Sequence, residues 1–228
     1  MHAAQEAVKE AMLHGIIEHP NIVKCYAVFA IPNYMGSIIA CLVEEFCDGG
    51  SLADRIRAGR YDKYRTTKSW TLQIISGLIK IHQHNIIHRD IKAQNVFIKG
   101  NVIKIGDLGV AVARLKVGWN GQQLHQSMNG DMICIAPEMF AGKPYDIHID
   151  VFGAGLILLG LIAGTTSPMY MTMPIGYAIH QGVSLDEILH SMNINSNHVF
   201  RQTLEGMLAR KRSERLSSSG AYNVLSNA

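Results

Sequence analysis

A short polar segment, Ile87–Asn95, carries the side chains whose chemistry is easiest to interpret. It reads Ile-His-Arg-Asp-Ile-Lys-Ala-Gln-Asn, so that a carboxylate, an amine and an amide follow one another as Asp90, Lys92 and Asn95. A carboxylate can accept a proton, an ammonium group can neutralise negative charge, and an amide oxygen can ligate a hard metal ion. A chance surface loop could contain the His-Arg-Asp triplet, but the longer pattern is much harder to obtain by chance.

A second acidic candidate, Asp107, follows soon afterwards. The residues Val102–Ile105 are mostly β-branched and predict a short strand, which leads into the turn sequence Gly-Asp-Leu-Gly. An Asp-x-Gly turn is ordinary when it stands alone. Its distance from Asn95 makes a functional role the stronger interpretation here.

Both strings resemble signature motifs of the eukaryotic protein kinases, and they occur in the kinase order. The first is similar to the catalytic loop H-R-D-x-x-x-x-N, and the second to the D-F-G metal site, with Leu108 in place of Phe. The resemblance implies that Asp90 accepts or orients the proton of a substrate hydroxyl and that Lys92 neutralises the transferring phosphate. It also implies that Asn95 and Asp107 ligate Mg²⁺.

Further matches imply structural roles. The string Ala136–Glu138 matches the A-P-E that closes the activation segment, and Asp150–Gly153 resembles the start of the long buried helix of the kinase C-lobe. In the family, this aspartate caps the backbone of the catalytic loop. Arg215 stands where the family has an arginine that pairs with the A-P-E glutamate, which is Glu138 in this sequence.

The nucleotide-binding half of the resemblance is less complete. Glu10 precedes His19–Val23 at the spacing of the family's αC glutamate, although a solvated helix face is the plainer explanation of an acidic residue. Val43–Leu52 resembles the hinge, where main-chain groups near Glu45 and Cys47 would meet the adenine edge of ATP. The hinge string Phe-Cys-Asp-Gly-Gly and the Lys-Ala-Gln-Asn of the catalytic loop are most similar to the NIMA-related (NEK) Ser/Thr kinases.

The 228 residues contain no counterpart of the Gly-rich loop or of the V-A-I-K strand that carries the nucleotide-binding lysine. Adenine would keep a floor at Phe97 without its apolar roof, and the phosphates would lose a main-chain cradle and a cation. Because removing one preorganised donor costs about 10²–10³ in rate, we expect impaired activity. The alternatives are a pseudokinase that acts as a protein-binding scaffold, and a true start upstream of Met1.

The resemblance spans residues 10–215 and predicts an α+β, protein-kinase-like fold. It divides the chain into a truncated N-lobe with the hinge at 1–47 and a mainly helical C-lobe at 48–228. The N-lobe would hold the αC helix and two strands, at Tyr26–Ile31 and Ser37–Val43. Because a two-stranded sheet is marginal alone, we expect a partner or a missing segment to complete it. The C-lobe is predicted to have helices at 66–82, 151–163, from 184, 198–208 and 217–225, and a surface loop at 165–182.

Certain positions bear on activity and its regulation. Glu44 occupies the gatekeeper position behind the adenine pocket, where a buried carboxylate would need a partner. Asp131 stands where Ser/Thr kinases have a Thr beside the catalytic Asp, which it would repel. Ser127 lies where NIMA-related kinases carry an activating phosphosite, and Arg89 would pair with that phosphate. An ordinary loop serine is an equally good interpretation of Ser127.

Composition limits the other classes of function. A hydrophobic content of 48% suits one sizeable core, and a net charge of +3 gives no basis for nucleic-acid binding. The basic residues between Arg55 and Lys68 are interpreted as a solvated face, with docking of an acidic partner as the alternative. Four cysteines without paired spacing indicate reduced thiols, and eleven histidines show no zinc-binding pattern.

The expected cellular setting follows from what the N-terminal and apolar segments look like. The N-terminus has no apolar signal region, and the apolar run 151–163 is too short to span a membrane. We therefore expect a cytoplasmic protein, with cytoskeletal association suggested by the NIMA-related resemblance. Its cofactors would be ATP and Mg²⁺. Its partner would be a protein substrate or a scaffold partner, with no nucleic acid and no membrane.

Overall fold

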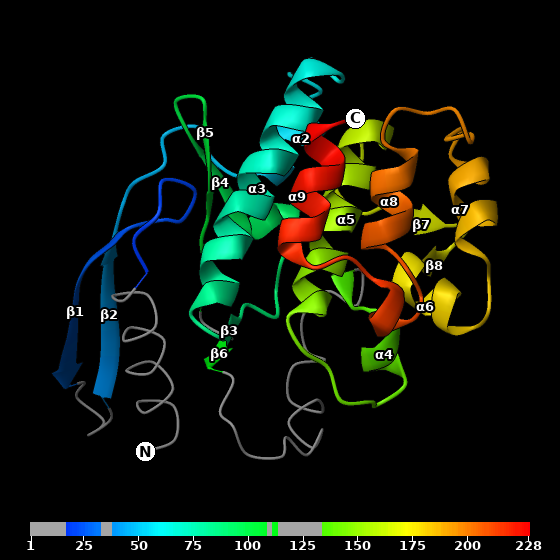
Figure 1. Cartoon of the computed structure of the whole chain (residues 1–228). Helices are drawn as coiled ribbons and strands as arrows, with labels where there is room; N and C mark the ends of the chain where they lie inside the picture. Colours follow the sequence, from blue (N-terminus) through cyan, green and yellow to red (C-terminus); the bar gives the residue numbers. More distant parts are fainter. Residues whose placement is uncertain (1–16, 33–37, 109–110, 114–133) are drawn as a thin grey trace.

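The computed structural model describes residues 17–32, 38–108, 111–113 and 134–228, and its architecture fits the expected α+β class. A pair of long strands lies at one side of the molecule and the helices gather at the other, with short strand pairs between and beyond them (Figure 1). Glu10, Ser127 and Asp131 fall outside the described ranges. The predicted division of the chain into two lobes at residue 47 stays a prediction.

The long pair consists of β1 (Cys25–Pro32) and β2 (Ile38–Glu44), which run antiparallel with a register irregularity near Cys25. The prediction of two strands here is confirmed. Their large apolar side chains are exposed to an unusual degree, since Tyr26 is 59% and Phe29 49% accessible. This sheet therefore contributes little apolar burial to the stability of the fold.

Two short antiparallel strand pairs hold the catalytic segment, and the strand predicted at Val102–Ile105 belongs to one of them. β3 (Ile86–Ile87) pairs with β6 (Val112–Ala113), and β4 (Val96–Lys99) pairs with β5 (Val102–Ile105). A single 3₁₀ turn at Ala93–Asn95 precedes β4. The predicted catalytic loop thus runs between the ends of two different strand pairs, which fixes both of its ends.

The helical part is built around α5 (His148–Ala163), whose residues are buried on nearly every side. The helix α3 (Arg65–Gln83) packs against it and buries Ile74, Leu78 and Ile81 in the core, and α9 (Ser218–Ser226) lies beside α3 (Figure 1). The remaining elements are α2 (Leu52–Arg57), α4 (Pro137–Phe140), β7 (Met169–Tyr170), β8 (Met173–Pro174), α6 (Ile175–His180), α7 (Leu185–Ser191) and α8 (Arg201–Met207).

The predicted surface loop at 165–182 is wrong. This stretch forms β7, β8 and α6, and Ile175, Ala178 and Ile179 are buried at helical spacing. Its Met, Pro and Gly content concealed a short apolar helix. Gly176 allows α6 to pack closely, because a Cβ atom there would lie only 1.9 Å from the carbonyl oxygen of Ile135.

Candidate catalytic site

The structure brings Asp90, Lys92 and Asn95 together around one carboxylate oxygen. The ammonium nitrogen of Lys92 lies 2.9 Å from Oδ2 of Asp90, and the side-chain amide of Asn95 donates to the same oxygen at 2.8 Å. The amide of Asn95 also donates to the Asp90 carbonyl at 3.0 Å. Within the described ranges, Oδ1 of Asp90 accepts no hydrogen bond. One oxygen of Asp90 therefore takes both of the side-chain contacts that position this carboxylate.

Asp107 is held next to this group through the backbone. The amide of Gly106 donates to the carbonyl of Asn95 at 2.9 Å, and Asp107 follows with a left-handed φ of 60° and an exposed side chain. A Cβ atom at Gly106 would lie 2.8 Å from the ring of Phe97, so only glycine permits this approach. Asn95 uses its amide nitrogen on Asp90, and its side-chain oxygen, like a carboxylate oxygen of Asp107, is a hard ligand of the type that Mg²⁺ prefers.

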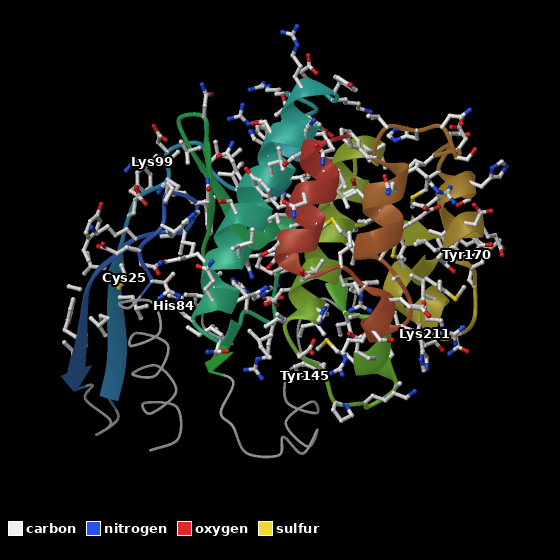
Figure 2. All side chains as sticks on the ribbon, viewed as in Figure 1. Cys25, His84, Lys99, Tyr145, Tyr170 and Lys211 are labelled. Atoms are coloured by element: carbon white, nitrogen blue, oxygen red, sulfur yellow. The ribbon has the colours of Figure 1, made fainter. Side chains whose placement is uncertain are left out.

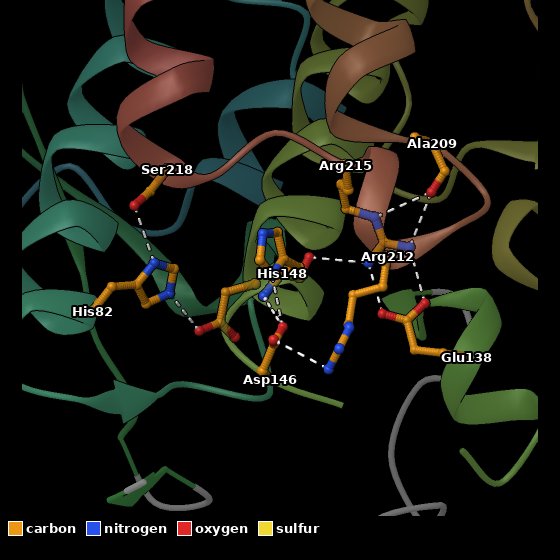
Figure 3. A network of polar contacts seen from close by, with 9 residues as sticks. His82, Glu138, Asp146, His148, Ala209, Arg212, Arg215 and Ser218 are labelled. Carbon is orange, nitrogen blue, oxygen red and sulfur yellow. Dashed lines mark hydrogen bonds and ion pairs between the residues drawn. The ribbon is translucent and has the colours of Figure 1, made fainter. Parts of the chain in front are cut away.

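Asp150 caps the loop that carries Asp90, as predicted. Its side chain is fully buried and accepts hydrogen bonds from the backbone amides of His88 and Arg89, each at 2.9 Å. Arg89 has a φ of 70°, a conformation that a non-glycine residue adopts at some cost. His82 bonds Asp150 at 2.9 Å and reaches Ser218 with its other ring nitrogen at 3.1 Å (Figure 3).

His88 connects the two halves of the site. It is completely buried, and burial lowers its pKa, so the ring is neutral at neutral pH. One ring nitrogen lies 3.3 Å from the amide of Asp90, which donates to it, and the other lies 3.0 Å from the carbonyl of Gly106, to which it donates. The neutral ring supplies one acceptor and one donor, which is what these two bonds require.

The predicted pair of Arg215 and Glu138 is also confirmed. The two charged groups form a bidentate contact at 2.7 and 2.9 Å, and both are buried (Figure 3). Arg215 donates further to the carbonyls of Ala209 and His148 and lies 4.9 Å over the ring of Phe152. This pair fastens α4 to α5 and to the chain that leads into α9.

The hinge offers main-chain groups of the kind predicted for adenine. The amide of Glu45 donates to the carbonyl of Lys24 at 2.8 Å, while among the described residues its own carbonyl receives only the weak thiol contact of Cys47 at 3.9 Å. In the described structure, the amide of Cys47 makes no hydrogen bond. Positions two apart in an extended chain present their groups on the same edge, so this carbonyl and this amide could serve one flat ligand.

The comparison with protein families decides the family. A model of the protein kinase domain matches residues 1–226. The chain belongs to the protein kinase family. It is 33% identical over 157 residues to the human serine/threonine-protein kinase Nek11, covering 67% of this chain and 23% of that protein. It is 36% identical over 157 residues to human Nek5 (67% and 21%) and 32% identical over 170 residues to STY46 of Arabidopsis thaliana (74% and 28%).

This kinase domain is thus NEK-like, and the matched region spans about a quarter of the length of these relatives.

The prediction for the gatekeeper residue, Glu44, needs a correction. Glu44 ends β2 opposite Cys25 and is exposed, so the prediction of a buried carboxylate is wrong. The two-stranded sheet does not enclose this position as a wider sheet would. Phe97 is half-buried on β4, and its place beneath adenine stays a prediction.

Sequence reasoning missed a buried ion pair of the kinase domain. The side chain of Glu45 lies 2.8 Å from Lys104 and 2.8 Å from Lys99, which Figure 2 labels. Lys104 is buried and donates also to the carbonyl of Pro20 at 2.9 Å. The available signal was a lysine between two isoleucines in Val102–Ile105. The pair connects the hinge to β5.

This ion pair predicts a dependence of stability on pH. Burial alone would raise the pKa of Glu45, but hydrogen bonds from Lys104 and Lys99 lower it from 4.5 to about 2. The unfolded chain therefore takes up this proton first, and the stabilisation is lost as pH falls from about 4.5 towards 2. We expect Glu45→Gln to cost about 1–2 kcal/mol at pH 7, allowing for solvent screening.

Urea unfolding of the wild type and of Glu45→Gln at pH 7, 5 and 3.5 checks this expectation. The stability difference between the two proteins should shrink on acidification, because only the wild type loses the ionised Glu45. Asp146, whose pKa burial would raise but hydrogen bonds from His148 bring to about 2, is present in both proteins and cancels. A difference that stayed constant with pH would contradict the assignment.

The clustered histidines and the helices bear on two other roles, metal binding and membrane insertion. His82, His84 and His88 lie close in sequence but bond to Asp150, to the Lys80 carbonyl and to the Gly106 carbonyl respectively. Over the described ranges, no three His, Cys, Asp or Glu side chains gather as a metal ion would need. Among the helices that the structure describes, none is both long and apolar enough to cross a membrane.

Proposed function

We propose that this chain is the catalytic domain of a Ser/Thr protein kinase of NIMA-related type, which transfers the γ-phosphate of Mg·ATP to protein hydroxyls. The convergence of Lys92 and Asn95 on Oδ2 of Asp90 carries the proposal. It holds the carboxylate rigidly and directs Oδ1 to a hydroxyl proton. The 33% and 36% identity to kinases named Nek11 and Nek5 supports the choice of subfamily.

Each residue then has a defined part in the transfer. Mg·ATP, when bound, supplies the phosphoryl group and the charge of the metal ion. Asp90 takes the proton of the attacking hydroxyl, and Lys92 neutralises charge on the phosphoryl oxygens. Asn95 and Asp107 hold Mg²⁺ by their oxygens. The main chain at Glu45 and Cys47 holds the adenine edge, with Phe97 beneath it.

The regulatory and N-lobe parts rest on similarity to the family. We propose that Glu10 belongs to the nucleotide site and that a phosphate on Ser127 pairs with Arg89, although Glu10 and Ser127 lie outside the described residues. Arg89 is adjacent to Asp90 in the sequence, so a phosphate bound to Arg89 would affect the conformation of the loop that carries Asp90. The protein substrate and a cytoplasmic, cytoskeleton-associated location are proposed on the same ground.

We further propose that residues 1–228 alone transfer phosphate slowly. They contain no Gly-rich loop and no lysine strand, and the apolar side chains of β1 and β2 are exposed. A partner or a further segment that covers this sheet would complete the N-lobe, with a division between the lobes near residue 47. The same observation favours the second candidate function, a pseudokinase whose C-lobe binds other proteins.

Two measurements on the 228-residue chain distinguish these functions. The first follows radiolabel from [γ-³²P]ATP and Mg²⁺ into dephosphorylated casein, and the second records the melting temperature with and without Mg·ATP. We expect slow labelling of Ser or Thr, and stabilisation by Mg·ATP that Mg²⁺ alone does not give. Saturation to 100 times Kd would add about 2.7 kcal/mol. If the chain showed no labelling and no shift in melting temperature, the pseudokinase would be the better description.

A further inference from the structure

A concave site lies beside α4, and its described lining includes none of the residues of the segment Ile87–Asn95. It is a pocket of about 660 Å³ between α4 and the stretch that joins α8 to α9, and these elements lie next to each other in Figure 1. Among the residues that the structure describes, its charged and titratable lining is almost wholly basic: Lys143, His180, Arg210, Lys211 and Arg212, with Glu138 as the one acidic member. None of these residues has a part in the proposed transfer of phosphate.

The basic charge of the pocket is only partly compensated. Glu138 is buried and neutralised by Arg215, so it does not offset the lining cations. Lys211 lies 2.8 Å from Glu214, and Arg212 lies 3.2 Å from Asp146 (Figure 3).

Lys143 and Arg210 differ from the other cations of the lining in their acidic neighbours. Considering the residues that the structure describes, no carboxylate lies within ion-pair distance of Lys143 or Arg210. Both are exposed, so their charged groups can meet a ligand from solution. Lys211, which Figure 2 labels, and Arg212 would add to the positive field even though each has an acidic neighbour.

The donor geometry favours a phosphate group. Guanidinium groups present forked donors that match phosphate oxygens, and Arg210 and Arg212 each supply one, while Lys143 adds a compact charge. Arg210 is oriented by a hydrogen bond to the carbonyl of His180 at 3.2 Å. A phosphomonoester carries nearly two negative charges at neutral pH, which two uncompensated cations would neutralise.

The size and walls of the pocket favour a polypeptide as the carrier of that phosphate. The volume of 660 Å³ is far larger than one anion and suits a ligand of several residues. Pro137, Ala141 and Pro144 give it apolar walls, whereas His180 carries the only aromatic ring in the described part of the lining that could stack on a base. We propose that this pocket binds a phosphorylated serine or threonine within a polypeptide segment. Binding would not require phosphate transfer, so it can be tested without Mg·ATP.

Fluorescence anisotropy with a labelled nine-residue peptide tests the proposal. The peptide carries one phosphoserine flanked by Gly and Ala, and the matched probe carries unmodified serine. We expect the phosphopeptide to bind at least about tenfold more tightly, since a charge-assisted hydrogen bond contributes this much or more. The double variant Lys143→Gln/Arg210→Gln should lose that preference. Its melting temperature should not change, because both side chains are exposed.

Matched controls separate this site from general attraction to a basic protein. Arg57→Gln/Arg60→Gln removes the same charge from exposed residues at and beyond the end of α2 and should bind like the wild type. Asp90→Asn should also bind normally, which keeps the outcome independent of kinase activity. Equal binding of the two peptides, or full phosphopeptide binding by the Lys143/Arg210 variant, would overturn the proposal. So would competition by inorganic phosphate as strong as that of the unlabelled phosphopeptide.

Discussion

The Asp90→Asn variant is expected to lose about 10²–10⁴ of its rate of phosphate transfer while it keeps its fold. In the wild type, Oδ2 of Asp90 receives both Lys92 and Asn95, and Oδ1 is left to take the substrate proton. An asparagine has the same shape, but its amide is a far weaker base. If its NH₂ group took the place of Oδ2, it would face two donors, and the ion pair between Lys92 and Asp90 would be lost in either orientation.

Initial rates of labelling at saturating Mg·ATP measure this effect, and the melting temperature shows whether the variant is folded. Asp62→Asn is the matched control, because Asp62 is exposed and its carboxylate accepts the backbone amides of Tyr64 and Arg65 at the start of α3. It should transfer phosphate at the wild-type rate. Transfer that survived in Asp90→Asn would refute the assigned role, and transfer lost equally in Asp62→Asn would point to general damage.

The site could be predicted from sequence where its chemistry is local. Asp90, Lys92 and Asn95 lie within one turn-rich loop, so their spacing nearly determines that the side chains meet. The pairing of Arg215 with Glu138 was also predicted, although 77 positions separate the two residues, because each belongs to a recognisable string. The cap formed by Asp150 was predicted in the same way.

Contacts without such a string could not be predicted. The sequence around Glu45 does not indicate that Lys99 and Lys104 of the β4–β5 hairpin contact it, since an acidic residue next to a strand is normally solvated. His82 follows Leu78 at helical spacing on the buried face of α3, but this spacing does not indicate that Asp150 is its partner. Long-range pairs of this kind depend on how the elements pack.

The errors in the fold have the same origin. The stretch 165–182 has the composition of a loop, but packing of α6 against α4 and β8 stabilises a helix of only six residues. Glu44 was expected in a closed pocket by analogy with a complete N-lobe. Its exposure on a two-stranded sheet shows how far burial of one residue depends on elements other than its own strand.

The variant Asp150→Ala is expected to lose about 3–5 kcal/mol of stability, a large part of what a typical domain has. The carboxylate is fully buried and receives the amides of His88 and Arg89 together with the ring of His82. Alanine would leave these donors without partners in a space that water does not reach. Arg89 would also lose the bond that holds its left-handed backbone.

Urea denaturation of Asp150→Ala, with Asp186→Ala as the control, measures this loss. The side chain of Asp186 is 81% exposed, and its partner Arg201 on α8 also pairs with Glu205, so removal of Asp186 should cost less than about 1 kcal/mol. Phosphate transfer by the folded fraction of Asp150→Ala should also fall, because the loop that presents Asp90 would no longer be fixed. A loss below 1 kcal/mol with normal transfer would show that the strand pairs β3–β6 and β4–β5 position the loop without this cap.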